Sequence, residues 1–205
     1  MPATALTVYI VEDDASVRDS LSLMLGLAGY PTALYADAEA FLAAYRDDWA
    51  GCVVADLRLP GKSGLDLQAE LRARGSTLPF IVMTAHGDVP SARTAFQAQA
   101  VDFLEKPFDH AQLRAAIDTA FSREGDRLAR RGDAEKLATL TEREREVLEH
   151  AARGLHAKEI AAALGISPRT VEVHKTRIMA KLGARNVAEV VRFAVAGSAD
   201  RDESG

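Results

Sequence analysis

The sequence predicts an α/β unit with a parallel sheet, followed by an all-α unit. Two observations support this division. Short apolar runs rich in β-branched residues recur through the first 122 residues, and a stretch with helical spacing follows each of them. From residue 139 onward, every segment instead has the spacing and end signals of a helix. Alternating strands and helices are typical of a parallel sheet that is covered by helices on both faces.

The expected strands lie at residues 6–11, 32–35, 52–55, 80–83 and 101–104. After the first of them, apolar residues recur at steps of three and four from Val17 to Ala28, and this helix should end at Gly29. The helix after the third strand should end at Gly75 in the same way. Five such units most often adopt the flavodoxin-like order, in which the first strand lies beside the third. We therefore expect a flavodoxin-like (βα)5 domain.

Residues 123–138 differ in composition, with nine charges in sixteen residues. This pattern favours a linker that joins a first domain at residues 1–122 to a second at residues 139–205. The spacing of Arg131 and Glu135 would equally suit one exposed helix, so the sequence leaves both structures open.

The second domain shows start signals for several helices. Thr141-x-x-Glu144 is a capping box that opens one helix, and Asn186-x-x-Glu189 caps a last one. Between them lie a short helix from about Lys158 to Leu164, a three-residue turn and a helix from Pro168 to about Leu182. This spacing predicts a helix-turn-helix.

Composition excludes several classes of protein. The chain has 205 residues, of which 48% are apolar and 27% charged, so it is not disordered throughout. No apolar run approaches the roughly 18 residues of a membrane span, and the start lacks a signal-peptide pattern. We expect a cytoplasmic protein with no membrane partner. Cys52 is the only cysteine, which excludes an internal disulfide, and its apolar neighbours favour a buried thiol.

Carboxylates follow two strands that should be neighbours. Glu12, Asp13 and Asp14 come directly after the first strand, and Asp56 comes directly after the third. The carboxyl ends of parallel strands meet at one edge of a sheet, so these side chains should converge there. Like charges this close repel unless a divalent cation such as Mg²⁺ lies among them. The alternative is that the acids only cap the next helix, which suits Asp14.

A hydroxyl and an ammonium should reach the same edge, because Thr84 follows the fourth strand and Lys106 follows the fifth. A carboxylate can accept a phosphoryl group whose oxygens a metal ion and a lysine neutralise and a hydroxyl hydrogen-bonds. The sequence contains no complete P-loop, no Gly-x-Gly-x-x-Gly and no pair of histidines at helical zinc-ligand spacing. A phosphoryl site is therefore the prediction.

The segments VYIVEDDASVR, VVADLRLPGKSG, IVMTAHGD and VDFLEKPF resemble the receiver domain of two-component response regulators, over residues 5–122. The resemblance implies that Asp56 accepts a phosphoryl group from a sensor histidine kinase, with Thr84 and Lys106 assisting. The Mg²⁺ ligands that it implies are the carboxylates of Glu12, Asp13 and Asp56 and the backbone carbonyl of Arg58. It also implies an aromatic switch residue, Phe103, and a cis peptide bond before Pro107.

The helix at residues 168–182 should have one buried and one exposed face. Core positions on one arc are Val171, His174, Ile178 and Leu182. Residues on the opposite arc are Arg169, Glu172, Val173, Thr176, Arg177 and Ala180. Hydrogen-bond donors, an acceptor and one apolar group suit the major groove of DNA. Six basic residues against two acidic ones between positions 165 and 192 also favour an anionic partner.

The stretch LTEREREVLEHAARGLHAKEIAAALGISPRTVEVHKTRIMAKLGARN resembles the LuxR-type helix-turn-helix of the NarL/FixJ group of response regulators, over about residues 140–186. The contacts to double-stranded promoter DNA that we expect are Lys158, Arg169, Thr170, Glu172, Val173, Lys175, Thr176, Arg177 and Lys181. Val173 should meet a thymine methyl group, whereas Lys175, Arg177 and Lys181 should bind phosphates. One departure is His156-Ala157, where the group commonly has Ser-Asn and hence a better helix cap.

Together these features predict a transcriptional response regulator and not an enzyme. Phosphorylation of Asp56 would promote a homodimer that binds promoter DNA, with RNA polymerase as a further partner. One alternative is an aspartyl-phosphate hydrolase, but such enzymes need Asp-x-Asp after the strand and this chain has Arg58 at the second position. The other is a regulator that binds only proteins. Binding to DNA discriminates between these functions.

Overall fold

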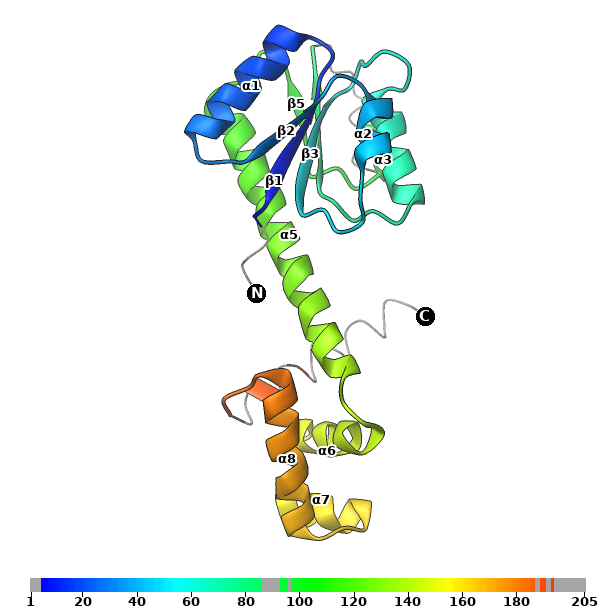
Figure 1. Cartoon of the computed structure of the whole chain (residues 1–205), viewed down its shortest axis with the longest axis vertical. Helices are drawn as coiled ribbons and strands as arrows, with labels where there is room; N and C mark the ends of the chain where they lie inside the picture. Colours follow the sequence, from blue (N-terminus) through cyan, green and yellow to red (C-terminus); the bar gives the residue numbers. More distant parts are fainter. Residues whose placement is uncertain (1–4, 86–92, 96, 187–188, 191–192, 194–205) are drawn as a thin grey trace. The chain divides into compact units, whose positions relative to one another are not determined.

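The computed structural model describes residues 5–85, 93–95, 97–186, 189–190 and 193 (Figure 1). The chain divides into two compact units, residues 1–126 and 127–205. Within the described residues, no helix is long and apolar enough to cross a membrane.

The first unit is built on a five-stranded sheet. Its strands are β1 (Thr7–Val11), β2 (Thr32–Tyr35), β3 (Gly51–Asp56), β4 (Phe80–Thr84) and β5 (Asp102–Glu105). All neighbouring strands are parallel, and their order is β2-β1-β3-β4-β5. The flavodoxin-like prediction is therefore confirmed, with β1 beside β3 and each expected strand within one residue of its observed limits.

Helices cover both faces of this sheet (Figure 1). They are α1 (Ala15–Leu27), α2 (Ala38–Ala44), α3 (Gly64–Ala73) and the first part of α5 (His110–Ala138). Alternate residues of the strands point to opposite sides, so Ile10 packs with residues of α1 and α5 whereas Tyr9 packs with residues of α2 and α3. The β3 strand is buried along its whole length, and the Cys52 thiol is buried as expected.

The charged stretch at residues 123–138 is helical, because α5 continues without a break to Ala138. Ion pairs one turn apart support its exposed part. Arg131 Nε lies 3.1 Å from Glu135 Oε1, and Lys136 Nζ lies 3.7 Å from Asp133 Oδ1. Of the two structures that the sequence leaves open here, the helix is the one that forms.

The second unit contains the predicted helix-turn-helix. Its helices are the end of α5, α6 (Glu142–Ala152), α7 (Ala157–Leu164) and α8 (Pro168–Leu182). Gly165 turns the chain after α7 with a φ of 65°, a conformation that favours glycine. Ser167 then caps α8 by accepting a hydrogen bond from the Thr170 N–H at 3.1 Å. A common apolar core holds α6, α7 and α8 together, with Val147, Ile160, Val171, Ile178 and Leu182 at its centre.

Two helix starts match what the sequence indicates, a weaker cap at His156 and a capping side chain at Asn186. His156 precedes α7 with no capping hydrogen bond from its side chain, although the Glu159 carboxylate accepts one from the His156 N–H at 2.7 Å. Asn186 Oδ1 accepts a hydrogen bond from the Glu189 N–H at 2.9 Å, as a helix cap would. Most of the last expected helix lies outside the described residues.

Candidate functional site

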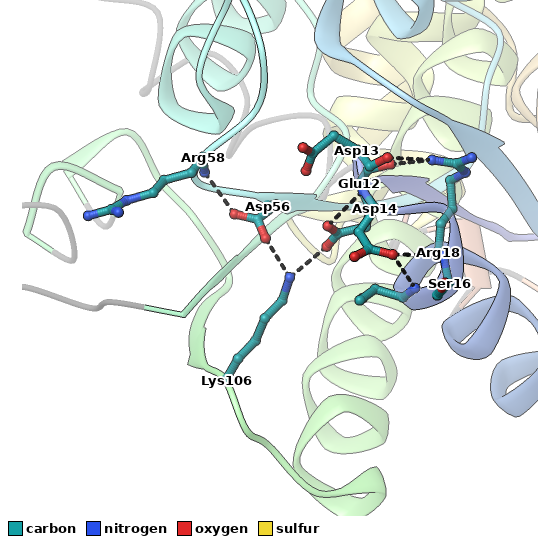
Figure 2. Close-up of polar contacts among 9 residues, drawn as sticks. Glu12, Asp13, Asp14, Ser16, Arg18, Asp56, Arg58 and Lys106 are labelled. Carbon is teal, nitrogen blue, oxygen red and sulfur yellow. Dashed lines mark hydrogen bonds and ion pairs between the residues drawn. The ribbon is translucent and has the colours of Figure 1, made fainter.

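Asp56 lies at the carboxyl end of β3, between β1 and β4, and only 8% of the residue is exposed. One carboxylate oxygen, Oδ1, accepts a hydrogen bond from the Arg58 N–H at 2.7 Å. The other, Oδ2, forms an ion pair with Lys106 (Figure 2). The carboxylate is therefore held in one orientation at the sheet edge.

Lys106 joins Asp56 to the acidic segment that follows β1. Its Nζ also lies 2.6 Å from Glu12 Oε2, so the ammonium stands between two carboxylates that come from different strands (Figure 2). Glu12 is only 2% exposed. The structure thus brings together three of the predicted site residues, whose positions along the chain are 44 and 50 residues apart.

The electrostatics of these groups follow from burial. Burial raises the pKa of the Glu12 carboxyl, and the hydrogen bond from Lys106 offsets that effect only in part. For Lys106, burial alone would lower the pKa of the ammonium, but its hydrogen bonds to Asp56 and Glu12 outweigh burial and raise that pKa. A positive charge is therefore strongly favoured between the two carboxylates.

The donor chemistry of this edge suits a hard divalent cation. Glu12 and Asp56 supply carboxylate oxygens, the ligands that Mg²⁺ prefers, and the shared ammonium marks where they stabilise positive charge. Asp13 is exposed beside them, and among the described residues no three acidic, histidine or cysteine side chains gather closely enough to enclose an ion. Two of the predicted ligands therefore lie together in this arrangement, and Arg58 contacts Asp56 through its amide.

Asp14 has a different role from its acidic neighbours. Its Oδ1 accepts hydrogen bonds from the N–H groups of Ser16 at 2.8 Å and Val17 at 3.2 Å, so it caps α1. The capping alternative thus holds for Asp14 (Figure 2). The sequence reasoning missed Arg18, whose guanidinium donates to the backbone carbonyl of Glu12 at 2.6 Å and steadies the acidic segment. Only its position, one turn into the capped helix, could have indicated this contact from the sequence, and that indication is weak.

The remaining predicted residues lie around this centre. Thr84 is fully buried at the end of β4, and its backbone carbonyl accepts the Lys106 N–H at 2.6 Å. Phe103 is partly buried on β5 and packs against the core on the α2 and α3 side of the sheet. The peptide bond between Lys106 and Pro107 is cis, as the resemblance implies.

A groove of about 410 Å³ lies beside Lys106, between α1 and the start of α5. Apolar side chains of α1 line one wall, and Pro107 and Phe108 line the other. Since Lys106 itself lines the groove, a partner group that enters it comes close to the carboxylate pair.

The outer face of α8 has the expected exposure. Exposed positions are Arg169, Glu172, Val173, Thr176, Arg177 and Ala180. Val173 has 44% of its surface exposed, although it is apolar. Val171, Ile178 and Leu182 are buried, whereas His174, also expected in the core, is only partly buried.

The other predicted DNA contacts differ in their exposure and in their ion pairs. Lys158 on α7 and Arg169 on α8 are exposed, and Thr170 is partly exposed. Lys175 Nζ lies 3.2 Å from Glu172 Oε1. Lys181 is already engaged, as its Nζ lies 2.6 Å from Glu144 Oε2. The sequence pattern did not reveal this last contact.

Comparison with known proteins gives matches for both units. Residues 8–118 match the model of the response regulator receiver domain, and residues 138–194 match that of the luxR family of bacterial regulatory proteins. The transcriptional regulatory protein FixJ of Azorhizobium caulinodans is 45% identical, over 98% of this chain and 97% of its own. FixJ of Rhizobium meliloti is 45% identical over 95% of this chain and 97% of its own.

Solved structures give the same result. Full-length FixJ from B. japonicum is 41% identical and has a TM-score of 0.60, with 96% of this chain and 98% of its own chain covered. The response regulator StyR is 39% identical and has a TM-score of 0.73, with 93% of this chain and 98% of its own covered.

Proposed function

Because the chain belongs to the DNA-binding transcriptional response regulators of two-component systems, we propose that Asp56 is its phosphoacceptor and that phosphorylation there controls DNA binding by α8. The observation that carries the first part is the Lys106 ammonium, which pairs with both Asp56 and Glu12 at the carboxyl edge of the sheet.

In the proposed reaction, an oxygen of the Asp56 carboxylate attacks the phosphorus of a kinase phosphohistidine. An O–P bond forms as the N–P bond breaks, and the imidazole leaves with the electron pair of that bond. Lys106 can exchange part of its pairing with the carboxylate for the phosphoryl oxygens, because its flexible side chain already reaches Asp56. Thr84, at the end of the adjacent strand, supplies the hydroxyl for one of these oxygens.

We assign the divalent cation to the carboxylates of Glu12, Asp13 and Asp56 and to the Arg58 carbonyl. When bound, Mg²⁺ neutralises charge on the phosphoryl oxygens. Arg18 donates to the backbone carbonyls of Glu12 and Asp13, at 2.6 and 3.3 Å, and so holds the backbone of the acidic segment in place. Asp13 is the ligand that must move inward, and its exposure leaves it free of tight packing.

Intact-mass spectrometry after treatment with acetyl phosphate and Mg²⁺ tests the phosphoacceptor. The unsubstituted chain should gain the mass of one phosphate, and Asp56→Asn should gain none. Asp14→Asn is the matched control, because asparagine can still cap α1 and Asp14 lies outside the proposed site. A phosphorylated Asp56→Asn variant would show that another residue accepts the phosphate.

For DNA, we propose that Val173 contacts a thymine methyl group and that Glu172 and Thr176 meet base edges. An exposed isopropyl group gains nothing for folding, which supports a contact outside the domain. Arg177 and Lys175 flank this row and suit phosphates.

Binding titrations test these roles with two duplexes, one selected from a random pool by the unsubstituted chain and one scrambled. Val173→Ala should weaken binding to the selected duplex by about tenfold and leave the scrambled duplex unchanged. Arg177→Ala should weaken both and reduce the slope of log affinity against log salt by about 1. Equal losses on both duplexes for Val173→Ala would show that this face does not read bases.

Further partners belong to the same proposal. Phosphorylation should favour a homodimer through the face formed by β5, α5 and the helix expected between β4 and β5, part of which lies outside the described residues. A shift of Thr84 would leave room there for the partly buried Phe103 ring. We also propose that the protein acts in the cytoplasm and that RNA polymerase is a further partner at the promoter. Light scattering before and after mass-verified phosphorylation tests the dimer. An unchanged monomer mass at micromolar concentration contradicts it.

A further inference from the structure

Lys181 occupies the last turn of α8, where its side chain is 35% exposed. Its ammonium is bound on two sides. Nζ lies 2.6 Å from Glu144 Oε2 and 3.0 Å from the backbone carbonyl oxygen of Thr139. The Glu144 side chain is only 4% exposed, so its negative charge needs a positively charged partner to offset the loss of water.

Glu144 is also part of the capping box of α6. The same oxygen, Oε2, accepts the Thr141 N–H at 2.8 Å. Thr139 lies in the turn that follows α5. One ammonium thus joins the end of α8 to the start of α6 and to the turn between α5 and α6.

This contact fixes α8 in its last turn, while three residues of its exposed face lie near the other end. Arg169, Glu172 and Val173 all belong to the first two turns of the helix. A tether at Lys181 limits sliding of α8 along its axis and rotation about it, and either motion would displace side chains that must meet base edges closely.

We propose that Lys181 and Glu144 form a positioning pair for the DNA-reading face of α8, and that Lys181 does not bind a DNA phosphate. The inference rests on the proposed role of α8. It replaces the phosphate contact that the sequence alone suggests for Lys181.

The two roles of Lys181 have opposite electrostatic consequences. Loss of a phosphate ligand reduces the salt slope by about 1 and weakens all duplexes alike. Removal of the Glu144 charge should then strengthen DNA binding, because the domain becomes more positive. For a positioning pair, loss of either partner weakens binding to the selected duplex and leaves the salt slope unchanged.

The experiment uses the full chain, with acetyl phosphate and Mg²⁺ present, on the selected and scrambled duplexes at several salt concentrations. Lys181→Met and Glu144→Gln should each weaken the selected duplex by about tenfold and spare the scrambled one. The double variant should lose no more than either single variant, because the pair acts as one unit. Lys181→Arg keeps the charge and should bind within about twofold of the unsubstituted chain.

The proposal is overturned if Lys181→Met lowers the salt slope and weakens both duplexes, or if Glu144→Gln tightens binding. Thermal unfolding identifies the temperature range in which each variant is folded, and the titrations are done within it. If Glu144→Gln does not fold, the comparison of Lys181→Met with Lys181→Arg still decides. Arg177→Ala and Val173→Ala, measured in parallel, report separately on the proposed DNA-reading face. If these two leave binding unchanged, the proposed role of α8 is wrong.

Discussion

Gly64 opens α3 at a point where the backbone passes close to Asp56, the proposed phosphoacceptor. A Cβ at this position would lie 2.3 Å from the Asp56 carbonyl oxygen, so alanine must push the two segments apart. We expect Gly64→Ala to lower the free energy of unfolding by about 1–3 kcal/mol and to slow phosphorylation by acetyl phosphate. Urea denaturation and intact-mass time courses measure the two effects.

Gly26 provides the matched control, since it is helical and a Cβ there would meet no heavy atom within 4 Å. Gly26→Ala should raise the free energy of unfolding by about 0.5–1 kcal/mol and leave phosphorylation unchanged. If both glycine substitutions stabilise the chain, close packing does not position Asp56.

The buried Cys52 thiol should make stability depend on alkaline pH. Burial raises the pKa of Cys52, and the charge of Glu124 adds to that effect. A group whose pKa is higher in the folded chain stabilises it fully below the pKa of the unfolded group. That contribution is lost as pH rises from about 8.5 toward the pKa of the thiol in the folded chain. The loss amounts to about 2 kcal/mol at pH 10.

The measurement compares urea unfolding of the unsubstituted chain and Cys52→Ala between pH 8 and pH 10. Alanine loses packing at every pH, but it has no thiol to ionise. The difference in the free energy of unfolding between the two chains should therefore narrow as pH rises. A difference that stays constant would mean that the Cys52 pKa is close to that of a free thiol.

At the scale of elements, the start of α7 is incompletely capped. Glu159 accepts the His156 N–H, but the imidazole returns no capping hydrogen bond. A serine hydroxyl at this position can accept the Glu159 N–H and complete the box. His156→Ser should therefore raise the free energy of unfolding of the second unit by about 0.5–2 kcal/mol. Thermal unfolding checks this, and an unchanged or lower midpoint contradicts it.

The five strands and the three helices α6, α7 and α8 could be predicted because their signals are local. Apolar spacing, capping residues such as Thr141 and Ser167, and the glycine at position 165 each act within a few neighbours. Residues 123–138 could not be assigned, because their stability depends on weak surface ion pairs that are compatible with either a coil or a helix.

Some contacts of the candidate sites could likewise be predicted from the sequence, and others could not. Strand ends place Glu12, Asp56 and Lys106 at one edge, and that follows from topology alone. The pairing of Lys181 with Glu144 spans 37 positions between separate helices, and no local pattern encodes it. Lys181 therefore resembles any other lysine at a helix end until the packing of α6 against α8 is known.

For the whole molecule, we propose that a charge change in the first unit controls DNA binding in the second. A phosphoryl group on Asp56 adds negative charge where Lys106 now pairs with two carboxylates, so the contacts of Lys106 must rearrange. If those contacts differ between two states of the chain, phosphorylation shifts the population between the states.

DNA affinity measured with and without phosphorylation tests this claim most directly. Fluorescence anisotropy with the selected duplex compares the unsubstituted chain and Asp56→Asn, each with and without acetyl phosphate and Mg²⁺. We expect the affinity for DNA to rise by about 5–150-fold in the unsubstituted chain and to stay constant in Asp56→Asn. An equal rise in Asp56→Asn, or no rise in a chain shown by mass to be phosphorylated, would contradict it.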